Sequence, residues 1–469
     1  KKNIHLSLEV KAPLNQVQSI RVNGRETGFE LLDESVPVPR IRIDAGVAPA
    51  YEIEIEWAGE ELNTKKVTAK IARGEKLHLE LPFKAEKIYD PQSVLQSAQV
   101  GKGVLRGTVS SAEGNKTLFV QVSSGKMNFW LPVELEVVKP VEILNQSDSE
   151  SLAFDLVNHT DKPVAGELWV NGNNTGIVKI PAQGKTTHQF SSPVTTLGTN
   201  KIEVKVGKTT HDLYAINWNI ANPVAQEYRT VVMADSFNET VRDIFAYGKY
   251  LSPRWEYTTL QVPTQGMGQW CHPNDLSIID DSGIRSLAAA NGGTFTLPQG
   301  IPFATPGSED AKNIVFTTLW DNYPASVTLP LSGKASKAYF LVAASTYHMQ
   351  AYVLNGQIRV SYADGTEEVL DLVLPDNLIP LDQDLFIDGW AFYTPQPRPW
   401  RVRLKTGDVS KYHAGELGGR MSNDPIYVDG GMATLLDLPL DPEKELVSLT
   451  LETIANEVII GLMGVTLKQ

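Results

Sequence analysis

Residues 200–207 read NKIEVKVG, and this short stretch indicates the fold class. Apolar and polar residues alternate with a period of two, as in a strand that has one face in a core and the other in water. The same alternation recurs in the runs IHLSLEV (4–10), YEIEIEW (51–57), KLHLELP (76–82) and QIRVSYA (357–363). We therefore expect an all-β protein.

Turn signals separate these runs. Type I′ hairpins favour Asn-Gly and Asp-Gly dipeptides, which occur at Asn23-Gly24, Asn171-Gly172, Asn355-Gly356 and Asp364-Gly365. Helical periodicity is scarce. The best candidate for a helix is residues 237–246, where Ser236 and Glu239 have the spacing of a capping box.

The length of 469 residues exceeds what one hydrophobic core supports, so several domains are expected. We predict a β-sandwich unit over 1–140, which can divide into two subdomains around a connector at 84–100. The frequent short strands of 141–225 predict an immunoglobulin-like sandwich without a disulfide. Residues 226–469 predict a galactose-binding-like jelly roll with long loops.

Charge is spread unevenly along the chain. The formal net charge is −13, and residues 226–469 hold 29 Asp and Glu against 17 Lys and Arg. An acidic surface repels phosphate backbones, which disfavours nucleic acid as a partner. No apolar run reaches the roughly 18 residues of a membrane-spanning helix.

Two further features bear on the compartment and the ends of the chain. The single cysteine, Cys271, excludes an internal disulfide but does not decide the compartment. The first ten residues lack the apolar stretch of a signal peptide, so we expect the interior of a longer chain.

Aromatic and polar residues crowd the loops of the last predicted domain. Residues 252–285 read SPRWEYTTLQVPTQGMGQWCHPNDLSIIDDSGIR, and similar mixtures occur in LWDNYP (319–324) and DGWAFYTPQPRPWRVR (388–403). An aromatic ring stacks on the C–H face of a sugar, and polar groups around it take the hydroxyls. The alternative is that the rings fill the end of a sandwich. The tryptophans in regular strand patterns, Trp57, Trp130, Trp169 and Trp218, are predicted to be core.

The candidate carbohydrate-binding residues follow from this pattern. The predicted stacking residues are Trp255, Trp270, Trp320, Tyr323 and Trp390, and the predicted hydrogen-bonding residues are Arg254, His272, Asp321, Asn322 and His348.

An acidic stretch offers a candidate cation site. Residues 361–388 contain eight Asp and Glu and no Lys or Arg. Asp382 and Asp384, in a loop flanked by proline, offer the oxygen ligands that Ca²⁺ prefers. A solvated acidic face is the alternative. No other cofactor is expected.

Catalysis has weaker support. Asp280, Asp281 and Asp321 could supply paired carboxylates, but glycoside hydrolysis needs separations of roughly 5 Å or 6.5–9.5 Å that loops in a sequence do not specify. The chain has no nucleophile elbow, P-loop, zinc-protease or dinucleotide motif. We therefore assign no catalytic residue.

Three segments carry a resemblance to a known family: PTQGMGQWCHPNDLSIIDDSGIR (263–285), residues 316–350, and GQIRVSYADGTEEVLDLVLPDN (356–377). They resemble the C-terminal β region of large secreted bacterial proteins of the six-hairpin glycosidase-like kind. More weakly, RVNGRETGFE (21–30) and residues 115–135 are similar to the β-sandwich that follows the helical toroid of those proteins. No helices here could form such a toroid. The resemblance implies a secreted or periplasmic accessory β portion, with a catalytic domain encoded upstream in the same polypeptide.

The sequence thus predicts a non-catalytic accessory portion of a polysaccharide-degrading enzyme, which contacts polysaccharide or oligosaccharide through its last domain. Two alternatives stay open. The jelly roll could itself be a hydrolase or lyase that uses loop carboxylates, or the chain could be a structural or adhesion scaffold.

Overall fold

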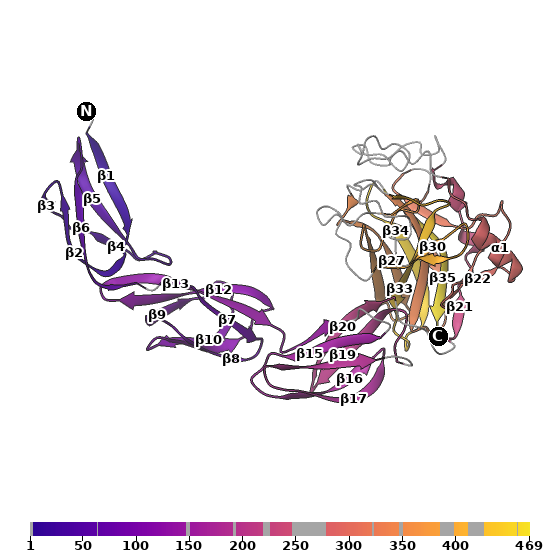
Figure 1. The fold of residues 1–469 in the computed structure, drawn as a ribbon, viewed down its shortest axis with the longest axis horizontal. Helices are drawn as coiled ribbons and strands as arrows, with labels where there is room; N and C mark the ends of the chain where they lie inside the picture. The colour runs from indigo at the N-terminus through magenta and orange to yellow at the C-terminus, as the bar shows by residue number, and fades with distance from the viewer. Residues whose placement is uncertain are drawn as a thin grey trace.

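The computed structural model describes residues 3–62, 64–146, 151–190, 194–218, 226–245, 278–320, 323–346, 350–384, 398–410, 426–456 and 458–469. It is a chain of β-sandwich domains, as the period-two patterns predict. Figure 1 shows four units that follow one another along a curved, elongated molecule, with the largest unit at the C-terminal end. No helix among the described residues is long and apolar enough to cross a membrane.

The first unit packs two small sheets around one core. The sheets have the orders β1-β5-β4 and β3-β2-β6. Ile20, Ile41 and Ile43 are fully enclosed between them. The strands are β1 (Ile4–Lys11), β2 (Leu14–Val22), β3 (Arg25–Glu26), β4 (Glu30–Leu32), β5 (Arg40–Ala48) and β6 (Ile53–Glu61).

The second unit has a separate core, so residues 1–140 form two units. Leu62 packs against both cores and marks the division. The proposed connector 84–100 instead forms strands β9 and β10 of the second unit. Its sheets, β7-β13-β12-β9 and β10-β11-β8, consist of β7 (Val67–Ala72), β8 (Lys76–Glu80), β9 (Lys84–Tyr89), β10 (Leu95–Gly101), β11 (Val104–Val109), β12 (Gly114–Ser124) and β13 (Met127–Val138).

The third unit is an immunoglobulin-like sandwich of seven strands. A three-stranded sheet, β14-β15-β18, faces a four-stranded sheet, β17-β16-β19-β20. Phe154, Leu156 and Ile202 lie in the core between them. The strands are β14 (Val141–Asn145), β15 (Leu152–Asn158), β16 (Val164–Val170), β17 (Asn173–Ile180), β18 (Gly184–Phe190), β19 (Gly198–Val206) and β20 (Thr209–Asn217).

The C-terminal domain is an antiparallel sandwich with an additional layer. Its seven-stranded sheet, β21-β35-β26-β33-β30-β31 with β24 paired to β35, faces the four-stranded sheet β25-β34-β27-β28. Phe340 and Ile358 belong to the core between the sheets. On the other face of the large sheet, a second core contains Ile284 of helix α1 and Phe303 of β23. The finer galactose-binding-like assignment stays a prediction.

The elements of this domain are β21 (Tyr228–Thr230), η1 (Ala234–Ser236), η2 (Val241–Phe245), α1 (Ser282–Ala290), β22 (Thr294–Thr296), β23 (Pro302–Ala304), β24 (Val315–Thr318), β25 (Ser326–Pro330), β26 (Lys337–Thr346), β27 (Leu354–Tyr362), β28 (Glu367–Val373), β29 (Gln383–Asp384), β30 (Arg401–Arg403), β31 (Val409–Ser410), β32 (Ile426–Tyr427), β33 (Met432–Pro439), β34 (Leu446–Thr453) and β35 (Val458–Lys468).

Several local expectations need correction. Over the described residues 237–245, the predicted helix is replaced by the 3₁₀ segment η2; residue 246 lies outside the described part. Thr240, just before η2, donates a hydrogen bond from its Oγ1 to Asp243. Asn355-Gly356 is no hairpin turn and lies inside β27. At Asp364-Gly365 the chain does turn, but only the glycine has a positive φ, of 82°. Asn23-Gly24 and Asn171-Gly172 have positive φ at both residues, which confirms these turns.

Tryptophans in strands do not all lie in cores. Trp218 is buried and Trp57 packs against the first core, as predicted. Trp130 and Trp169 are half-buried, and the residues before and after each of them in the strand are buried. Both tryptophans therefore point away from the cores. Side chains of adjacent residues in a strand point to opposite faces. The prediction of core positions is therefore wrong for these two.

Candidate functional site

The loop residues predicted to bind carbohydrate fall mostly outside the described part of the chain. This holds for Arg254, Trp255, Trp270, His272, Asp321, Asn322, His348 and Trp390. Their role stays a prediction.

Trp320 and Tyr323, the two stacking candidates that the structure does describe, lie in the C-terminal domain's second core. Each is only 6% exposed. The indole Nε1 of Trp320 donates to the Asn456 carbonyl at 2.9 Å. The Tyr323 hydroxyl donates to Glu239 at 3.2 Å, and burial raises the pKa of that hydroxyl far above its ordinary range. In this conformation both rings pack inside the domain.

Asp281, one of the carboxylates considered for catalysis, takes part in a buried hydrogen-bond network. Asp281 is buried and accepts hydrogen bonds from Arg285 Nε and Asn313 Nδ2, each at 2.8 Å. Arg285 in turn donates to the carbonyls of Pro306, Ser308 and Ala311. Asp281 therefore holds helix α1 to the following loop, which is a structural role.

The calcium candidates are described only in part. Asp382 is buried, and its backbone carbonyl accepts from the Val428 amide at 2.8 Å. Asp384 pairs through its backbone with Ile426, but its side chain lies outside what the structure describes. Among the described residues, no three His, Cys, Asp or Glu side chains cluster as metal ligands do. A calcium site at Asp382 and Asp384 stays a prediction.

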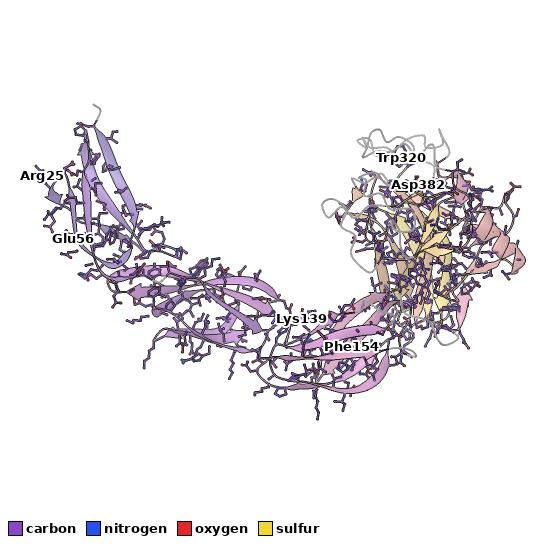
Figure 2. The ribbon with its side chains drawn as sticks, in the orientation of Figure 1. Arg25, Glu56, Lys139, Phe154, Trp320 and Asp382 are labelled. Atoms are coloured by element: carbon purple, nitrogen blue, oxygen red, sulfur yellow. The ribbon has the colours of Figure 1, made fainter. Side chains whose placement is uncertain are left out.

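A concave site among the described residues lies elsewhere, where the third unit meets the C-terminal domain. It is a cleft of about 540 Å³, within the size range of ligand sites. In Figure 2, Trp320 and Asp382 lie toward the opposite end of the C-terminal domain from this junction. We call it the junction cleft; its polar and aromatic lining includes Lys201, Glu203, Tyr214, Glu368, Asp441 and Lys468.

A buried ion pair fixes the two walls of the junction cleft. Lys337 Nζ on β26 lies 2.7 Å from Asp437 Oδ2 on β33, and the two side chains are 4% and 3% exposed. The ammonium also donates to Thr196 Oγ1 and to the Leu197 and Thr199 carbonyls of the third unit. Burial lowers the pKa of Lys337, but the charge of Asp437 and these oxygen acceptors favour its charged form.

The third unit completes this network from its side. The Thr199 backbone amide and hydroxyl both donate to Asp437, at 2.8 and 2.9 Å. Gly198 has a φ of 85°, and a Cβ there would lie 2.6 Å from Asp437 Oδ2, so glycine permits the close approach. Leu197 packs into the C-terminal domain's second core. We call Thr196, Leu197, Thr199, Lys337 and Asp437 the junction clamp.

One wall of the junction cleft comes from the outer face of β19 and β20. Lys201 lies opposite Tyr214 across the two strands, with its ammonium 5.9 Å from the ring centroid. The same ammonium lies 3.2 Å from Glu203. Tyr214 is half exposed. This wall therefore combines an accessible ring with a cation and a carboxylate.

The other wall contains groups whose titration is shifted by burial. Burial, with a contribution from the charge of Lys337, lowers the pKa of Lys468 to about 8. Burial raises the pKa of Glu368 above its ordinary value, although the charges of Lys201 and Lys444 oppose the shift. The junction cleft can thus offer two amines, three carboxyls and a ring to a polar ligand.

The sequence did not indicate the junction cleft. Its lining residues come from segments of two domains that are distant in the chain, and none is among the predicted binding residues. One usable signal was the outward position of Tyr214 on β20, where Leu213 packs toward the third core.

Comparisons with known proteins identify no family. No protein-family model and no curated protein matches the chain. Solved structures with some likeness include the N-terminal four immunoglobulin domains of Dscam1, at 12% identity and a TM-score of 0.17, over 46% of this chain and 72% of that one. A segment of titin has 11% identity and a TM-score of 0.15, over 46% and 97%.

A third structure, an endo-fucoidan hydrolase of glycoside hydrolase family 107, has 8% identity and a TM-score of 0.15, over 45% of this chain and 41% of that one. Likeness at this level carries no argument about function.

Proposed function

We propose that this chain is a non-catalytic accessory array of β-domains that serves a polysaccharide-degrading protein. Its C-terminal domain contacts carbohydrate, and the three slender units before it hold that domain at a distance from other parts. Carbohydrate of this kind lies outside the cytoplasm, so a secreted or periplasmic location belongs to the same proposal. A catalytic domain upstream in the same polypeptide would supply the hydrolysis.

The observation that carries this proposal is the junction cleft. Its volume of about 540 Å³ suits a few sugar units. The half-exposed ring of Tyr214 offers a stacking face, and the amines and carboxyls that line the cleft offer partners for hydroxyls. Because the junction clamp is buried, the two walls keep their spacing without a ligand, which reduces the ordering cost of binding.

The expected affinity is modest. A stacked ring contributes about 1–3 kcal/mol when its apolar face leaves water. One ring with a few exposed polar partners therefore predicts a dissociation constant in the high-micromolar to millimolar range.

Affinity electrophoresis of the full chain tests the proposal. The gels would contain a β-glucan, a xylan, a galactomannan or a polygalacturonate, and the same mixtures would be assayed for released reducing sugar. We expect retardation by at least one polysaccharide without release of sugar. Tyr214→Ala should weaken the retardation about tenfold, the loss of roughly 1.4 kcal/mol.

Tyr352→Ala is the matched control, because Tyr352 is 51% exposed, as is Tyr214, and lies outside the junction cleft. It should leave retardation unchanged. Release of reducing sugar would overturn the non-catalytic role. Retardation of Tyr214→Ala equal to that of the wild type would show that the junction cleft does not hold the carbohydrate.

A further inference from the structure

The second unit presents three aromatic rings on the outer face of its four-stranded sheet. They are Tyr89 on β9, Phe119 on β12 and Trp130 on β13. Tyr89 is 58% exposed, and the other two rings are half-buried. Phe119 lies directly opposite Tyr89 across the strand pair, and Trp130 lies on the next strand. We call these three residues the aromatic face.

The third ring of the aromatic face is steeply inclined to the first. Tyr89 and Phe119 have centroids 6.3 Å apart, and their ring planes are tilted by 31°. Trp130 stands at 72° to Tyr89, with the centroids 6.4 Å apart. A flat ligand that rests on the first two rings would therefore meet the edge or face of the third.

The surroundings of the aromatic face are polar but close to neutral. Gln121 lies opposite Trp130 on one side and Lys87 on the other, so its amide lies beside the rings. Glu86 accepts a hydrogen bond from the Ser123 hydroxyl at 3.2 Å and lies 3.9 Å from Lys84. A neutral, hydroxyl-rich ligand matches this balance better than a polyanion does.

The aromatic face is not needed for the core of its unit. The alternate residues of the same strands, including Val120 and Leu131, already fill that core. The sheet is mixed, since β13 pairs with β9's neighbour β12 antiparallel and with β7 in parallel. When one face of a sheet covers a core, the outer face is ordinarily polar, and a contiguous aromatic patch there marks a binding surface.

We propose that the aromatic face is a second carbohydrate site, which takes a segment of a neutral polysaccharide. A pyranose ring would stack its C–H face on Tyr89 and Phe119 with Trp130 alongside, while the Gln121 amide takes a hydroxyl. This inference rests on the proposed function and extends it to a different domain.

Two sites would change how the chain binds a polymer. In Figure 1 the second unit and the C-terminal domain are separated by the third unit. A long polysaccharide can touch both sites, so that the second contact becomes intramolecular and the overall affinity exceeds that of either site. A short oligosaccharide cannot gain in this way.

Affinity electrophoresis of the full chain with the four polysaccharides named above tests the inference through Tyr89→Ala. We expect about tenfold weaker retardation by the neutral polysaccharide, and a smaller loss for Gln121→Ala. Tyr89→Phe keeps the ring and should bind within about twofold of the wild type. Tyr352→Ala is again the control for removal of an exposed ring, and thermal unfolding checks that each variant is folded.

The outcomes separate this inference from the proposed function. If Tyr89→Ala is retarded as strongly as the wild type while Tyr214→Ala is not, the aromatic face is overturned and the junction cleft is supported. If Tyr89→Ala loses all retardation and Tyr214→Ala loses none, the junction cleft is overturned and the aromatic face is supported. Retardation of the wild type by none of the four polysaccharides overturns both proposals, and retardation by polygalacturonate alone overturns the aromatic face.

Discussion

Lys468 lies at the edge of the junction cleft, and its amine should make stability depend on pH. Its pKa of about 8 in the folded chain lies below the ordinary value of 10.5. Between these values the unfolded chain binds a proton that the folded chain has released, so stability rises with pH. This rise in stability ends near pH 10. Above that pH the tyrosines of the unfolded chain lose their protons, whereas Tyr362 in the folded chain keeps its proton because burial raises its pKa to about 12. The unfolded chain then binds fewer protons than the folded chain, and stability falls with pH.

Thermal unfolding of wild type and Lys468→Met from pH 7 to 9.5 measures this effect. The wild type should gain in melting temperature relative to the variant as the pH rises. Lys405→Met is the control, because the hydrogen bond to Asp429 raises the pKa of Lys405 and moves its titration out of the window. A constant difference between wild type and Lys468→Met across the range would contradict the prediction.

The tryptophans show how far single residues can be predicted. The sequence places loop tryptophans on a surface and strand tryptophans in cores, but the loop residue Trp320 is buried, whereas Trp130 and Trp169 face outward from their strands. The strand cases could have been predicted, since Phe129 and Leu131 occupy the inward positions on either side of Trp130. The loop case could not, because whether a loop folds back over a core depends on contacts distant in sequence.

At the scale of one element, β27 depends on a glycine that its sequence presents as a turn. A Cβ on Gly356 would lie 2.2 Å from Ile460 Cδ1 and 2.5 Å from the Glu452 carbonyl oxygen. Neither neighbour can move freely, because both belong to strands of the C-terminal sandwich. Gly356→Ala should therefore lower the free energy of unfolding of that domain by about 1–3 kcal/mol.

Urea denaturation, followed by tryptophan fluorescence, tests this expectation. Gly28→Ala is the control, because a Cβ at Gly28 would have open space around it to 4 Å and the φ of this residue is compatible with alanine. Equal denaturation midpoints for Gly356→Ala and the wild type would show that β27 and β35 can separate without cost.

Strands could be predicted from the sequence where one face is buried in a core and the other is exposed to solvent. The alternating runs became strands β1, β6, β8, β19 and β27. The central strands β26 and β35 are buried on both faces, so their sequences do not alternate. Helix α1 has only nine residues, and its buried Arg285 interrupts an apolar stripe, which explains why the sequence did not indicate it.

At the scale of the whole molecule, no pattern in the sequence points to the junction clamp. Thr199 and Asp437 are 238 positions apart, and each residue is unremarkable in its own strand. Two surfaces that meet only in the folded chain leave no period or motif in either segment. The order of the sandwiches could be predicted from turn signals, but their mutual attachment could not.

The junction clamp should fix the C-terminal domain against the third unit. Lys337→Met removes the cation and leaves Asp437 charged and buried, which should cost about 3–5 kcal/mol of stability. Adding Asp437→Asn should restore part of the loss, because the amide oxygen still accepts from Thr199 without a charge. Lys405→Met breaks an exposed pair with Asp429 and should cost at most about 1 kcal/mol.

Small-angle X-ray scattering checks the consequence for shape. With the junction clamp intact, the distances between the third unit and the C-terminal domain vary little, because the ammonium is anchored on Thr196, Leu197 and Thr199 at once. Lys337→Met should broaden the pair-distance distribution, and Lys405→Met should not. A variant that loses stability but keeps the wild-type scattering curve would show that apolar contacts around Leu197 hold the two units together without the ion pair.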